Sequence, residues 1–361
     1  MKFVHIADIH FDQSFTTLDS LAQAGEERRL DQRKAFRKVI EYVRDNKIPY
    51  LWIAGDLYEN ETVRESTIQN INTWFQEIPE TKVFIAPGNH DPYIKNSYYE
   101  TYPWYHNVVI VKPGVSYFEE PDFDLYTFGF GNFYDNSREI ENLNIRNKDK
   151  INVLLMHANL DGSKKGEQEY NPILRKTLQE KGFDYVALGH IHKSNYAEAK
   201  EDGIVYPGSL LSLGFDELGA HGMIVGSLEK VDGKTKLSYE FVPVDEKEFQ
   251  EIQLDVSGTN TIEELIEMLN DLPANPNYKK IILTGRRNFE IDISKLRKNC
   301  NQEKILKIKD ETKLQVDFEK EINTFTLKGL FIKEAYQAMA TGELTQEEIE
   351  KALEIGLEVL E

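Results

Sequence analysis

The chain has 361 residues, of which 40% are hydrophobic and 29% charged, so it is long enough for two or three domains with a substantial core. Its formal net charge of −19 excludes a generally basic nucleic-acid coat but not a nuclease, because bound cations and local basic patches can still hold DNA. Strand-sized apolar runs and a single cysteine, Cys300, exclude a transmembrane span and a disulfide framework. Since the amino terminus begins with a strand pattern instead of a signal peptide, we expect a cytoplasmic protein.

Short apolar runs alternate with amphipathic helical stretches in the first part of the chain. Helices are predicted over residues 26–46 and 62–78, and Asn171-Pro172 is expected to open a third helix with proline at its first position. Strands separated by helices predict a layered α/β core with both sheet faces covered. Turns at residues 112–114 and 232–233 predict that part of the sheet is antiparallel. The expected strands are residues 3–6, 50–54, 83–86, 108–111, 126–130, 153–156, 185–188, 204–206 and 223–225.

A composition shift after residue 245 predicts further domains. The expected divisions are a first domain over residues 1–245, a small α+β cap over 246–310 and a helical tail over 311–361. The cap should contain a strand, a helix and a strand over residues 249–256, 261–270 and 280–283.

The tail is predicted to contain two helices separated by Thr341-Gly342. Helix starts in the cap and the tail carry the capping-box pattern, a threonine followed three residues later by a glutamate. These pairs are Thr261 with Glu264 and Thr345 with Glu348. The second tail helix should present a broad apolar stripe made of Ile349, Leu353, Leu357 and Leu360.

Polar side chains of one kind follow five of the expected strands. In open α/β sheets, ligands bind just beyond the carboxyl ends of the strands, so these loops should converge. Five of the eight histidines in the chain lie at these ends, which random placement would not produce. The residues concerned are Asp8, His10, Asp56, Asn89, His90, Asp91, His157, His190 and His192.

These side chains combine carboxylates, imidazoles and one amide, without a thiolate. Such a donor set suits Mn, Fe, Zn or Co better than Ca. One carboxylate can bridge two cations, and metal ions roughly 3.5–4 Å apart are the standard device for in-line attack on phosphorus. Two other histidines are expected to be structural: His5, which faces away by strand parity, and His221, which lies between glycines.

The order Asp-x-His, Gly-Asp, Gly-Asn-His-Asp, His and Gly-His-x-His resembles the calcineurin-like metallophosphoesterases over roughly residues 1–225. The resemblance implies a four-layer α-β-β-α domain that binds two divalent metal ions. The ligand set that it implies is Asp8, His10 and His192 for one metal, Asn89, His157 and His190 for the other, and Asp56 as the bridge. It also makes His90 the acid that protonates the leaving oxygen or stabilises the transition state. Asp91 would either orient His90 or another group next to the ligands, or form an ordinary turn, and these interpretations stay open.

Further motifs resemble one branch of that family, the SbcD-type DNA repair nucleases and particularly the bacterial YhaO-type proteins. These motifs are residues 6–11, 54–58, 206–209 and 214–217. In such nucleases a small α+β cap follows the catalytic domain, and a helical tail docks on a coiled-coil ATPase. One position departs from the pattern, because relatives often have histidine three residues after the bridging aspartate, where this chain has Glu59. That histidine is linked to positioning the scissile phosphate, so exonuclease efficiency or polarity is in question.

A basic stretch lies within the predicted cap. Residues 277–309 contain ten Lys/Arg against three Asp/Glu, a local balance of about +7. Ordinary surface variation is one explanation, and contact with DNA phosphates is the other. The candidate DNA contacts are Lys279, Lys280, Arg286, Arg287, Lys295, Arg297 and Lys298.

Together these features predict a metal-dependent DNA exonuclease or endonuclease of double-strand-break repair. It would use Mn²⁺ in preference to Fe, Zn or Co and act with an SbcC-like coiled-coil ATPase, which would bind its carboxyl-terminal helices. Two alternatives remain: a small-molecule phosphodiesterase, and a weakly catalytic adaptor that regulates the ATPase. The tail helices could instead pack on their own domain. A homodimer is also left open.

Overall fold

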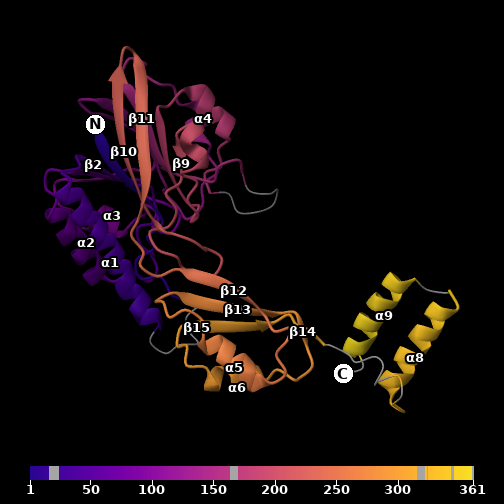
Figure 1. Cartoon of the computed structure of the whole chain (residues 1–361). Helices are drawn as coiled ribbons and strands as arrows, with labels where there is room; N and C mark the ends of the chain where they lie inside the picture. Colours follow the sequence, from indigo (N-terminus) through magenta and orange to yellow (C-terminus); the bar gives the residue numbers. More distant parts are fainter. Residues whose placement is uncertain (16–23, 163–169, 315–321, 323, 343–344, 360–361) are drawn as a thin grey trace. The chain divides into compact units, whose positions relative to one another are not determined.

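The computed structural model of the chain describes residues 1–15, 24–162, 170–314, 322, 324–342 and 345–359. These residues form two compact units (Figure 1). The first unit consists of Met1–Gln250 and Asn275–Lys279, and the second of Glu251–Ala274 and Lys280–Glu361. Among the described residues, no helix combines the length and the hydropathy that crossing a lipid bilayer requires.

The first unit contains two mixed β-sheets. The six-stranded sheet has the order β11-β10-β1-β2-β3-β4, and the five-stranded sheet the order β5-β6-β7-β8-β9. The strands of the first sheet are β1 (Lys2–Ile6), β2 (Tyr50–Ile53), β3 (Lys82–Ile85), β4 (Val108–Ile110), β10 (Gly222–Val231) and β11 (Lys234–Pro243). Those of the second are β5 (Gly114–Glu119), β6 (Phe123–Gly129), β7 (Ile151–His157), β8 (Tyr185–Gly189) and β9 (Ile204–Val205).

Most neighbouring strands are parallel, so their carboxyl ends share one edge of each sheet. β1 to β4 pair in parallel, and so do β6 to β9. The exceptions are β10, which is antiparallel to both β1 and β11, and β5, which is antiparallel to β6. The expectation of a partly antiparallel sheet is therefore confirmed. The turn at residues 232–233 joins the antiparallel β10 and β11, whereas residues 112–114 lead from β4 into β5 of the other sheet.

The helices of the first unit are α1 (Ala24–Asp45), α2 (Glu65–Gln76), α3 (Tyr98–Thr101) and α4 (Arg175–Lys181), with 3-10 turns η2 (Glu139–Asn142) and η3 (Glu198–Glu201). The apolar faces of α1 and α2 pack on one side of the six-stranded sheet, where Phe36 and Phe75 meet Ile53. α4 contributes Leu178 to the outer side of the five-stranded sheet.

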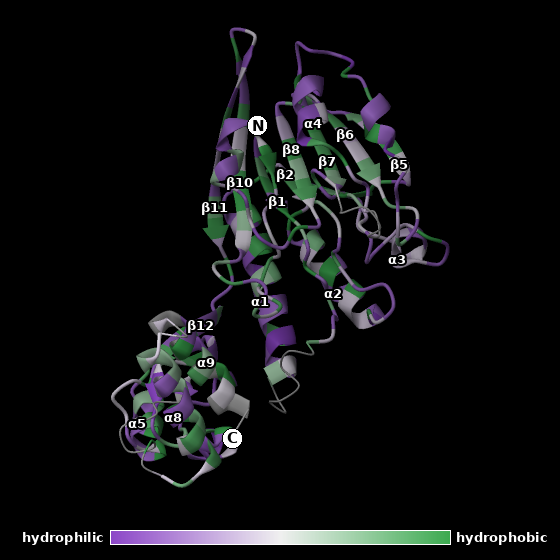
Figure 2. Ribbon diagram, turned by 90° about the vertical axis from the view of Figure 1, so that its right-hand side faces the viewer, coloured by the Kyte–Doolittle hydropathy of each residue, from purple (hydrophilic) through white to green (hydrophobic). Residues whose placement is uncertain are grey.

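Three layers of buried side chains hold four layers of secondary structure together. The first joins α1 and α2 to the six-stranded sheet, and the third joins the five-stranded sheet to α4. Between them, the facing sides of the two sheets share a core in which Phe3 and Trp52 meet Tyr185. Strand alternation produces this arrangement, since Phe3 enters the central core while Val4 faces the helices. Hydrophobic residues accordingly run along the central strands (Figure 2), and the predicted α-β-β-α architecture is confirmed.

One predicted helix start in this unit was wrong, and two of its strands were not predicted. The third helix begins at Arg175, because the backbone before it is engaged elsewhere: Asn171 has φ of 47° and Ile173 donates its N–H to the carbonyl of Asn159. The strands β5 and β11 were not expected. The alternating Leu237, Tyr239 and Phe241 pack against the central core and would have indicated β11.

The second unit is built around a three-stranded sheet with the order β12-β13-β15. Its elements are β12 (Phe249–Asp255), α5 (Ile262–Asn270), β13 (Tyr278–Thr284), β14 (Arg286–Arg287), α6 (Ile293–Asn299), β15 (Ile305–Asp310) and β16 (Lys313–Leu314). Thr261 caps α5 as predicted, because its hydroxyl accepts a hydrogen bond from the backbone N–H of Glu264. α6 and the last three strands were not predicted within this charged stretch.

The tail forms α8 (Leu327–Ala340) and α9 (Gln346–Val359). The carboxylate of Glu348 accepts a hydrogen bond from the backbone N–H of Thr345, as the capping box predicts. Ile349 and Leu353 are buried against Ile332 of α8. Two of the four residues of the predicted apolar stripe thus pack within the tail itself. Leu360 lies outside the described residues, as does the side chain of Leu357.

Candidate metal centre

The polar residues predicted from the strand ends lie where the parallel strands of both sheets finish. Two follow β1 and one follows β2, two follow β3, one is the last residue of β7 and two follow β8. These are, in the same order, Asp8 and His10; Asp56; Asn89 and His90; His157; and His190 and His192. Because neighbouring strand ends meet at one edge, residues separated by up to 184 positions become neighbours.

Two glycines allow the strand ends to approach one another closely. A Cβ atom at Gly189, the last residue of β8, would overlap the carbonyl oxygen of Ala54, which follows β2 in the other sheet. A Cβ atom at Gly88 would overlap the carboxylate of Asp56. Both glycines belong to the motifs recognised in the sequence, so their physical role is to let the backbone bring these loops together.

The backbone is strained at several of these positions. Asp8, His10 and Asp56 have φ angles of 54°, 53° and 52°, and His190 has φ of 104°. Non-glycine residues rarely adopt such values, and they persist only where the surrounding structure enforces them. Strained backbone gathered at one point of a fold is typical of a functional site.

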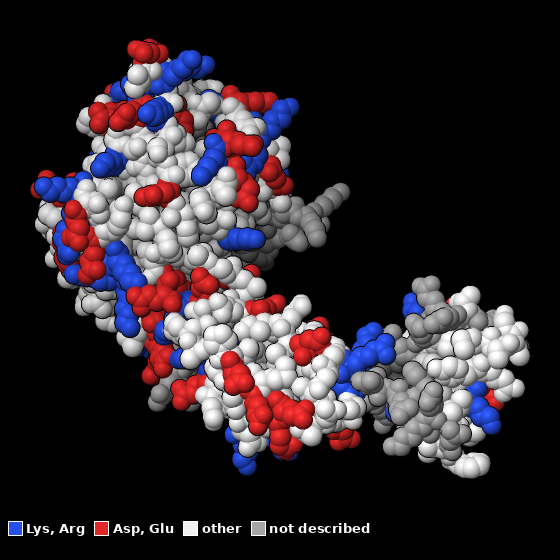
Figure 3. All heavy atoms as spheres, in the orientation of Figure 1, with Lys and Arg blue, Asp and Glu red and all other residues white. Residues whose placement is uncertain are grey.

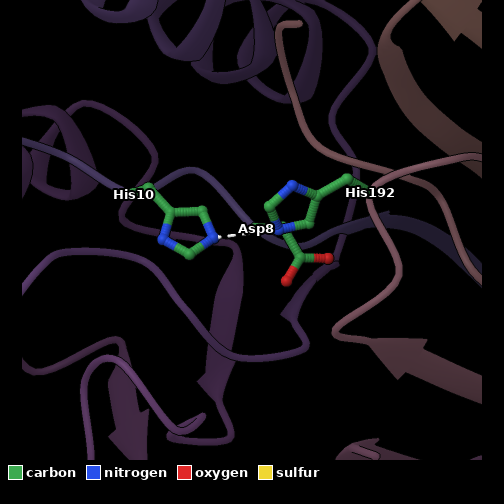
Figure 4. A group of neighbouring side chains, drawn as sticks. All are labelled: Asp8, His10 and His192. Atoms are coloured by element: carbon green, nitrogen blue, oxygen red, sulfur yellow. Dashed lines mark hydrogen bonds between the residues drawn. The ribbon is translucent and has the colours of Figure 1, made fainter. Parts of the chain in front are cut away.

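Asp8, His10 and His192 form the first group of potential ligands, with one ligand atom from each lying within 4.8 Å of the others (Figure 4). The two imidazoles face each other, with their Nε2 atoms 3.2 Å apart. Their Nδ1 atoms each contact a carboxylate: Glu59 Oε1 lies 2.7 Å from His10, and Glu217 Oε1 lies 2.5 Å from His192. Because ionised carboxylates only accept hydrogen bonds, each Nδ1 carries hydrogen, and the two Nε2 atoms converge as the nitrogens that a metal ion could bind.

Asp56 connects this group to a second one. Its Oδ2 lies 3.2 Å from His157 Nε2 and 3.8 Å from His10 Nε2, so one carboxylate faces both groups. His157 Nε2 also lies 2.8 Å from Asn89 Oδ1, and its Nδ1 lies 2.9 Å from the carbonyl of Ala54. The arrangement matches the position that a bridging carboxylate requires. Together with the converging nitrogen and oxygen donors, it fits a pair of divalent metal ions.

His190 is the predicted ligand least closely integrated with the others. Its ring centroid lies 5.1 Å from that of His157, and 4.9 Å from that of Tyr170. Its backbone N–H donates to both carboxylate oxygens of Asp8, at 3.0 Å each. His190 therefore helps to hold Asp8 in place, whatever its side chain binds.

His90 is more exposed than the predicted ligands, with 45% of its side chain accessible to solvent. Its Nδ1 lies 2.9 Å from Glu59 Oε2, which leaves Nε2 as the nitrogen that can reach a substrate. His10, Asp56 and His90 also form a third potential ligand group, so geometry alone permits a metal-binding role for His90. Its exposure suits a group that must meet both solvent and substrate.

Asp91 orients the loops of the site. Its buried carboxylate accepts hydrogen bonds from the backbone N–H groups of Asp56, Leu57 and Gly88, at 3.0, 2.7 and 2.7 Å, and from the Tyr99 hydroxyl at 2.6 Å. Within the described structure it makes no hydrogen bond to His90, whose orientation comes from Glu59 instead. Asp91 thus ties together the loops after β2 and β3, whereas the sequence had left open a plain turn and the orientation of His90 or of a neighbouring group.

Three residues form hydrogen bonds with the predicted site residues, but the sequence did not indicate these contacts. Glu59 was noticed only as a departure from the family pattern, and Glu217 only as part of a motif. Tyr99 carried no signal, since its contact with Asp91 depends on α3 packing beside the loop. The predictions for the remaining histidines agree with the geometry: His5 is buried 3.0 Å from the Tyr185 hydroxyl, and His221 bonds to Ser209.

The electrostatic field of the cluster favours positive charge. Burial lowers the pKa of His90, but the hydrogen bond to Glu59 and the negative charges of Asp56, Glu59 and Asp91 together outweigh this effect and raise the pKa to about 9. Burial likewise lowers the pKa of His192, but the hydrogen bond to Glu217 and the charges of Asp8, Glu217 and Asp56 together raise it to about 9. His190 differs, because burial and a neighbouring imidazole both lower its pKa, to about 3. Carboxylates thus offset the cost of burying positive charge at His90 and His192, whereas His190 lies beside another imidazole and is not compensated in this way.

The side chains of the basic stretch, which lies in the second unit from Lys280 onward, do not converge on one point as those of the metal centre do. Lys279 is fully buried, so the prediction that it contacts DNA from the surface was wrong. Lys280 pairs with Glu251 at 2.5 Å, and Lys295 with Glu263 at 2.7 Å. Acidic side chains lie among the basic ones on the face shown in Figure 3.

The remaining basic candidates differ in how far they are engaged. Arg287 Nη1 donates to the carbonyl of Phe289, and Arg297 Nη2 to that of Leu306. Arg286 and Lys298 are exposed, and their side chains form no ion pair with the described residues.

Two facing sheets between helices, with carboxylates, imidazoles and an amide at the strand ends, define a class of metal-dependent hydrolases. The family model for calcineurin-like phosphoesterases matches residues 1–194, more than half of the chain, and the protein belongs to that family. Members of the family use divalent metal ions, consistent with the ligand groups described above.

Two curated relatives extend the comparison. The metallophosphoesterase YhaO of Bacillus subtilis (strain 168), itself uncharacterised, is 26% identical over 282 residues, which cover 75% of this chain and 67% of that protein. The DNA double-strand break repair protein Mre11 of Methanopyrus kandleri is 27% identical over 298 residues, which cover 73% of this chain. The match spans only 61% of that archaeal protein. Both relatives agree with the resemblance to SbcD-type proteins.

Proposed function

We propose that the protein is a dinuclear-metal phosphodiesterase that hydrolyses DNA. The observation that carries the proposal is the convergence of Asp8, His10, Asp56, His157 and His192 at one edge of both sheets, with Asn89 in contact with His157 and the exposed His90 beside them. Asp8, His10 and His192 would hold one ion, and Asn89, His157 and His190 the other. Asp56 would hold both ions, because its carboxylate faces the two groups.

Metal ions at such a site supply Lewis acidity: they neutralise charge on the phosphoryl oxygens and favour ionisation of an attacking water. We propose Mn²⁺ as the physiological ion, since the donors are nitrogen and oxygen without a thiolate. His90 would then donate a proton from Nε2 to the leaving oxygen, while Glu59 holds its Nδ1. Asp91 holds together the loops that carry Asp56 and His90, because its carboxylate accepts hydrogen bonds from the backbone N–H groups of Asp56 and Gly88.

DNA is proposed as the substrate because one relative is named as a DNA double-strand break repair protein. The single cysteine, Cys300, is compatible with the reducing cytoplasm in which we place the reaction. The decisive assay incubates the full-length protein and Mn²⁺ with single-stranded DNA, duplex DNA and a chromogenic phosphodiester. We expect cleavage of DNA as well as of the ester. Ester cleavage without DNA cleavage, even with the ATPase added, would identify a small-molecule phosphodiesterase.

A coiled-coil ATPase is the partner that we propose for the tail. Ile349 and Leu353 are already used between α8 and α9, whereas Leu327 and Leu330 of α8 are exposed by 69% and 52%. Apolar side chains left uncovered on a helix are typical of docking surfaces. Replacing Leu327 and Leu330 by glutamate should weaken ATPase binding, measured by calorimetry, and leave ester hydrolysis intact. Unchanged binding would mean that this face of the tail is not the docking surface.

A further inference from the structure

Glu59 lies between two imidazoles that have different tasks in the proposed reaction. Its Oε1 is 2.7 Å from Nδ1 of His10, and its Oε2 is 2.9 Å from Nδ1 of His90. The rings of these two histidines are themselves in edge-to-face contact, with centroids 4.8 Å apart. One carboxylate therefore contacts both a potential metal ligand and the histidine that faces the substrate.

The backbone holds this carboxylate in place from both sides. The N–H of Glu59 donates to the carbonyl of Phe11, next to His10, at 3.1 Å. The N–H of the following residue, Asn60, donates to the carbonyl of His90 at 3.0 Å. Glu59 is thus attached to the loops after β1 and β3, and only 18% of its side chain is exposed. The contacts with both rings are built into the fold.

The chemistry of a carboxylate determines what these contacts do. An ionised carboxylate only accepts hydrogen bonds, so each ring must present a protonated Nδ1 to Glu59. For His10 this leaves the Nε2 lone pair directed at the group formed with Asp8 and His192. For His90 it leaves Nε2 as the nitrogen available to a substrate. Both orientations therefore depend on the same two oxygen atoms.

We infer that Glu59 is a positioning residue that couples metal binding by His10 to proton donation by His90. The inference rests on the proposed phosphodiesterase function. In the reaction, water adds its oxygen to phosphorus and the bond between phosphorus and the leaving oxygen breaks. The leaving oxygen takes the proton from His90 Nε2, and the proton released by the attacking water restores His90 through solvent. Glu59 holds His90 by its Nδ1, so that Nε2 is the nitrogen directed at the leaving oxygen.

This coupling has a consequence for substrate preference. A nitrophenolate leaves readily without a proton, whereas the alkoxide released from a DNA-like diester needs one. Glu59 should therefore matter more for esters with alkoxide leaving groups than for nitrophenyl esters. A side chain that only stabilised the fold would affect both kinds of ester alike.

Glu217 offers a matched control, because it makes the same kind of contact with a single ring. Its Oε1 lies 2.5 Å from His192 Nδ1, and its Oε2 accepts hydrogen bonds from the Leu213 N–H and the Ser209 hydroxyl. Loss of its charge should weaken metal binding by the group that contains His192, without altering the orientation of His90. Comparing the two glutamates separates a general effect on metal binding from the coupling that we assign to Glu59.

The test compares Glu59→Gln with Glu217→Gln in the full-length protein. An amide has one acceptor oxygen, so the substituted side chain can serve only one of the two rings that Glu59 contacts. For each variant, Mn²⁺ affinity is measured by calorimetry, and kcat at saturating Mn²⁺ is measured on bis(4-nitrophenyl) phosphate and on a thymidine dinucleotide. We expect both variants to lose about tenfold or more in Mn²⁺ affinity. Only Glu59→Gln should lower the kcat ratio of dinucleotide to nitrophenyl ester, by about tenfold or more. An equal ratio in the two variants would overturn the inference.

A second measurement tests the coupling independently of catalysis. In nitrogen-15 NMR spectra, Glu59→Gln should change the tautomer signal of at least one of His10 and His90, because the amide oxygen can serve only one ring, whereas Glu217→Gln should change only that of His192. If Glu59→Gln does not fold, Glu59→Asp replaces it, since a carboxylate shorter by one methylene can reach only one ring. If the unaltered protein hydrolyses neither ester, the proposed function fails, while the NMR spectra still decide the coupling. Unaltered signals from both rings would contradict it.

Discussion

The strand-end cluster of the first unit and the basic stretch of the second are both groups of charged side chains, but they are organised differently. The cluster draws residues from five loops between Asp8 and His192 into contact. Its members share partners, such as Glu59, and lie on strained backbone. The basic side chains are neighbours in sequence, yet most are engaged separately, by Glu251, by Glu263 or by backbone carbonyls.

The comparison shows why convergence is the stronger evidence for a site. Bringing distant residues together in buried, strained positions costs free energy, and such an arrangement persists only where the whole fold supports it. Exposed charges that pair with their neighbours cost little and contribute little. Substitutions should therefore have large effects in the cluster and small effects in the basic stretch.

The largest effect is expected for Asp56→Asn. The amide can still accept the hydrogen bond that Asp56 Oδ1 now accepts from the His90 N–H, so the loops should stay in place. It cannot supply the negative charge that both ligand groups share. Since metal ions contribute several kcal/mol of transition-state stabilisation, we expect activity to fall by roughly 10³-fold or more. Metal content after dialysis, measured by mass spectrometry, should fall as well.

A suitable control is Asp122→Asn, at an exposed position before β6 and so at the opposite edge of the sheet. It should change neither metal content nor rate. If Asp56→Asn retained two metal ions per chain, Asp56 would not be the bridge, and the two ligand groups would have to be independent.

His90→Ala should have the next largest effect, and on turnover alone. Removing a general acid typically slows a reaction by about 10²–10⁴-fold, and we expect kcat on the dinucleotide to fall within that range. Metal content should be unchanged if His90 faces the substrate. Loss of a metal ion would instead make His90 a ligand, as its proximity to His10 and Asp56 permits. The exposed His106→Ala provides the control, which should behave like the unaltered protein.

The sequence was sufficient to predict the members of this cluster but not their mutual contacts. Motifs at strand ends are local signals, so Asp8, Asp56 and His157 could be identified one loop at a time. The role of Glu59 depends on a residue 49 positions away in the sequence, and that of Glu217 on one 25 positions away. Only the tertiary fold brings these pairs together.

The same distinction explains the predictions of elements that failed. Apolar runs and capping residues identified most strands and the capped starts of α5 and α9, because those signals lie within one segment. The start of α4 was placed too early, because Ile173 bonds to Asn159 in another loop. Lys279 was assigned to the surface from its charge, although its position on β13 turns it into the core.

Asp91→Ala tests whether the loops of the cluster depend on one buried carboxylate. The substitution leaves three backbone N–H groups and the Tyr99 hydroxyl without their acceptor. Each buried donor without a partner costs about 1–3 kcal/mol, so we expect the free energy of unfolding to fall by about 3 kcal/mol or more. Urea denaturation with a chelator present measures this loss without the contribution of bound metal. Asp122→Ala should change the same quantity by less than about 0.5 kcal/mol, and a similarly small loss for Asp91→Ala would contradict its role.

The smallest effects are expected in the basic stretch, where Arg286 and Lys298 are the candidates best placed to contact DNA. Both are exposed, and no described carboxylate pairs with either side chain. If both contact phosphates, replacing both by alanine should reduce the slope of log affinity against log salt by about two, because each lost contact removes about one released counterion. Fluorescence anisotropy with labelled duplex DNA at several salt concentrations measures the slope.

The informative control replaces Lys280 and Lys295, a change that removes the same net charge from side chains already paired with Glu251 and Glu263. A charge already neutralised by a neighbour releases few counterions, so this pair should change the slope by clearly less than two. Equal changes for both pairs would mean that DNA responds only to the overall charge of the unit. An unchanged slope for Arg286 and Lys298 would leave the stretch as ordinary surface charge, and DNA would then have to be held by the strand-end cluster and its metal ions.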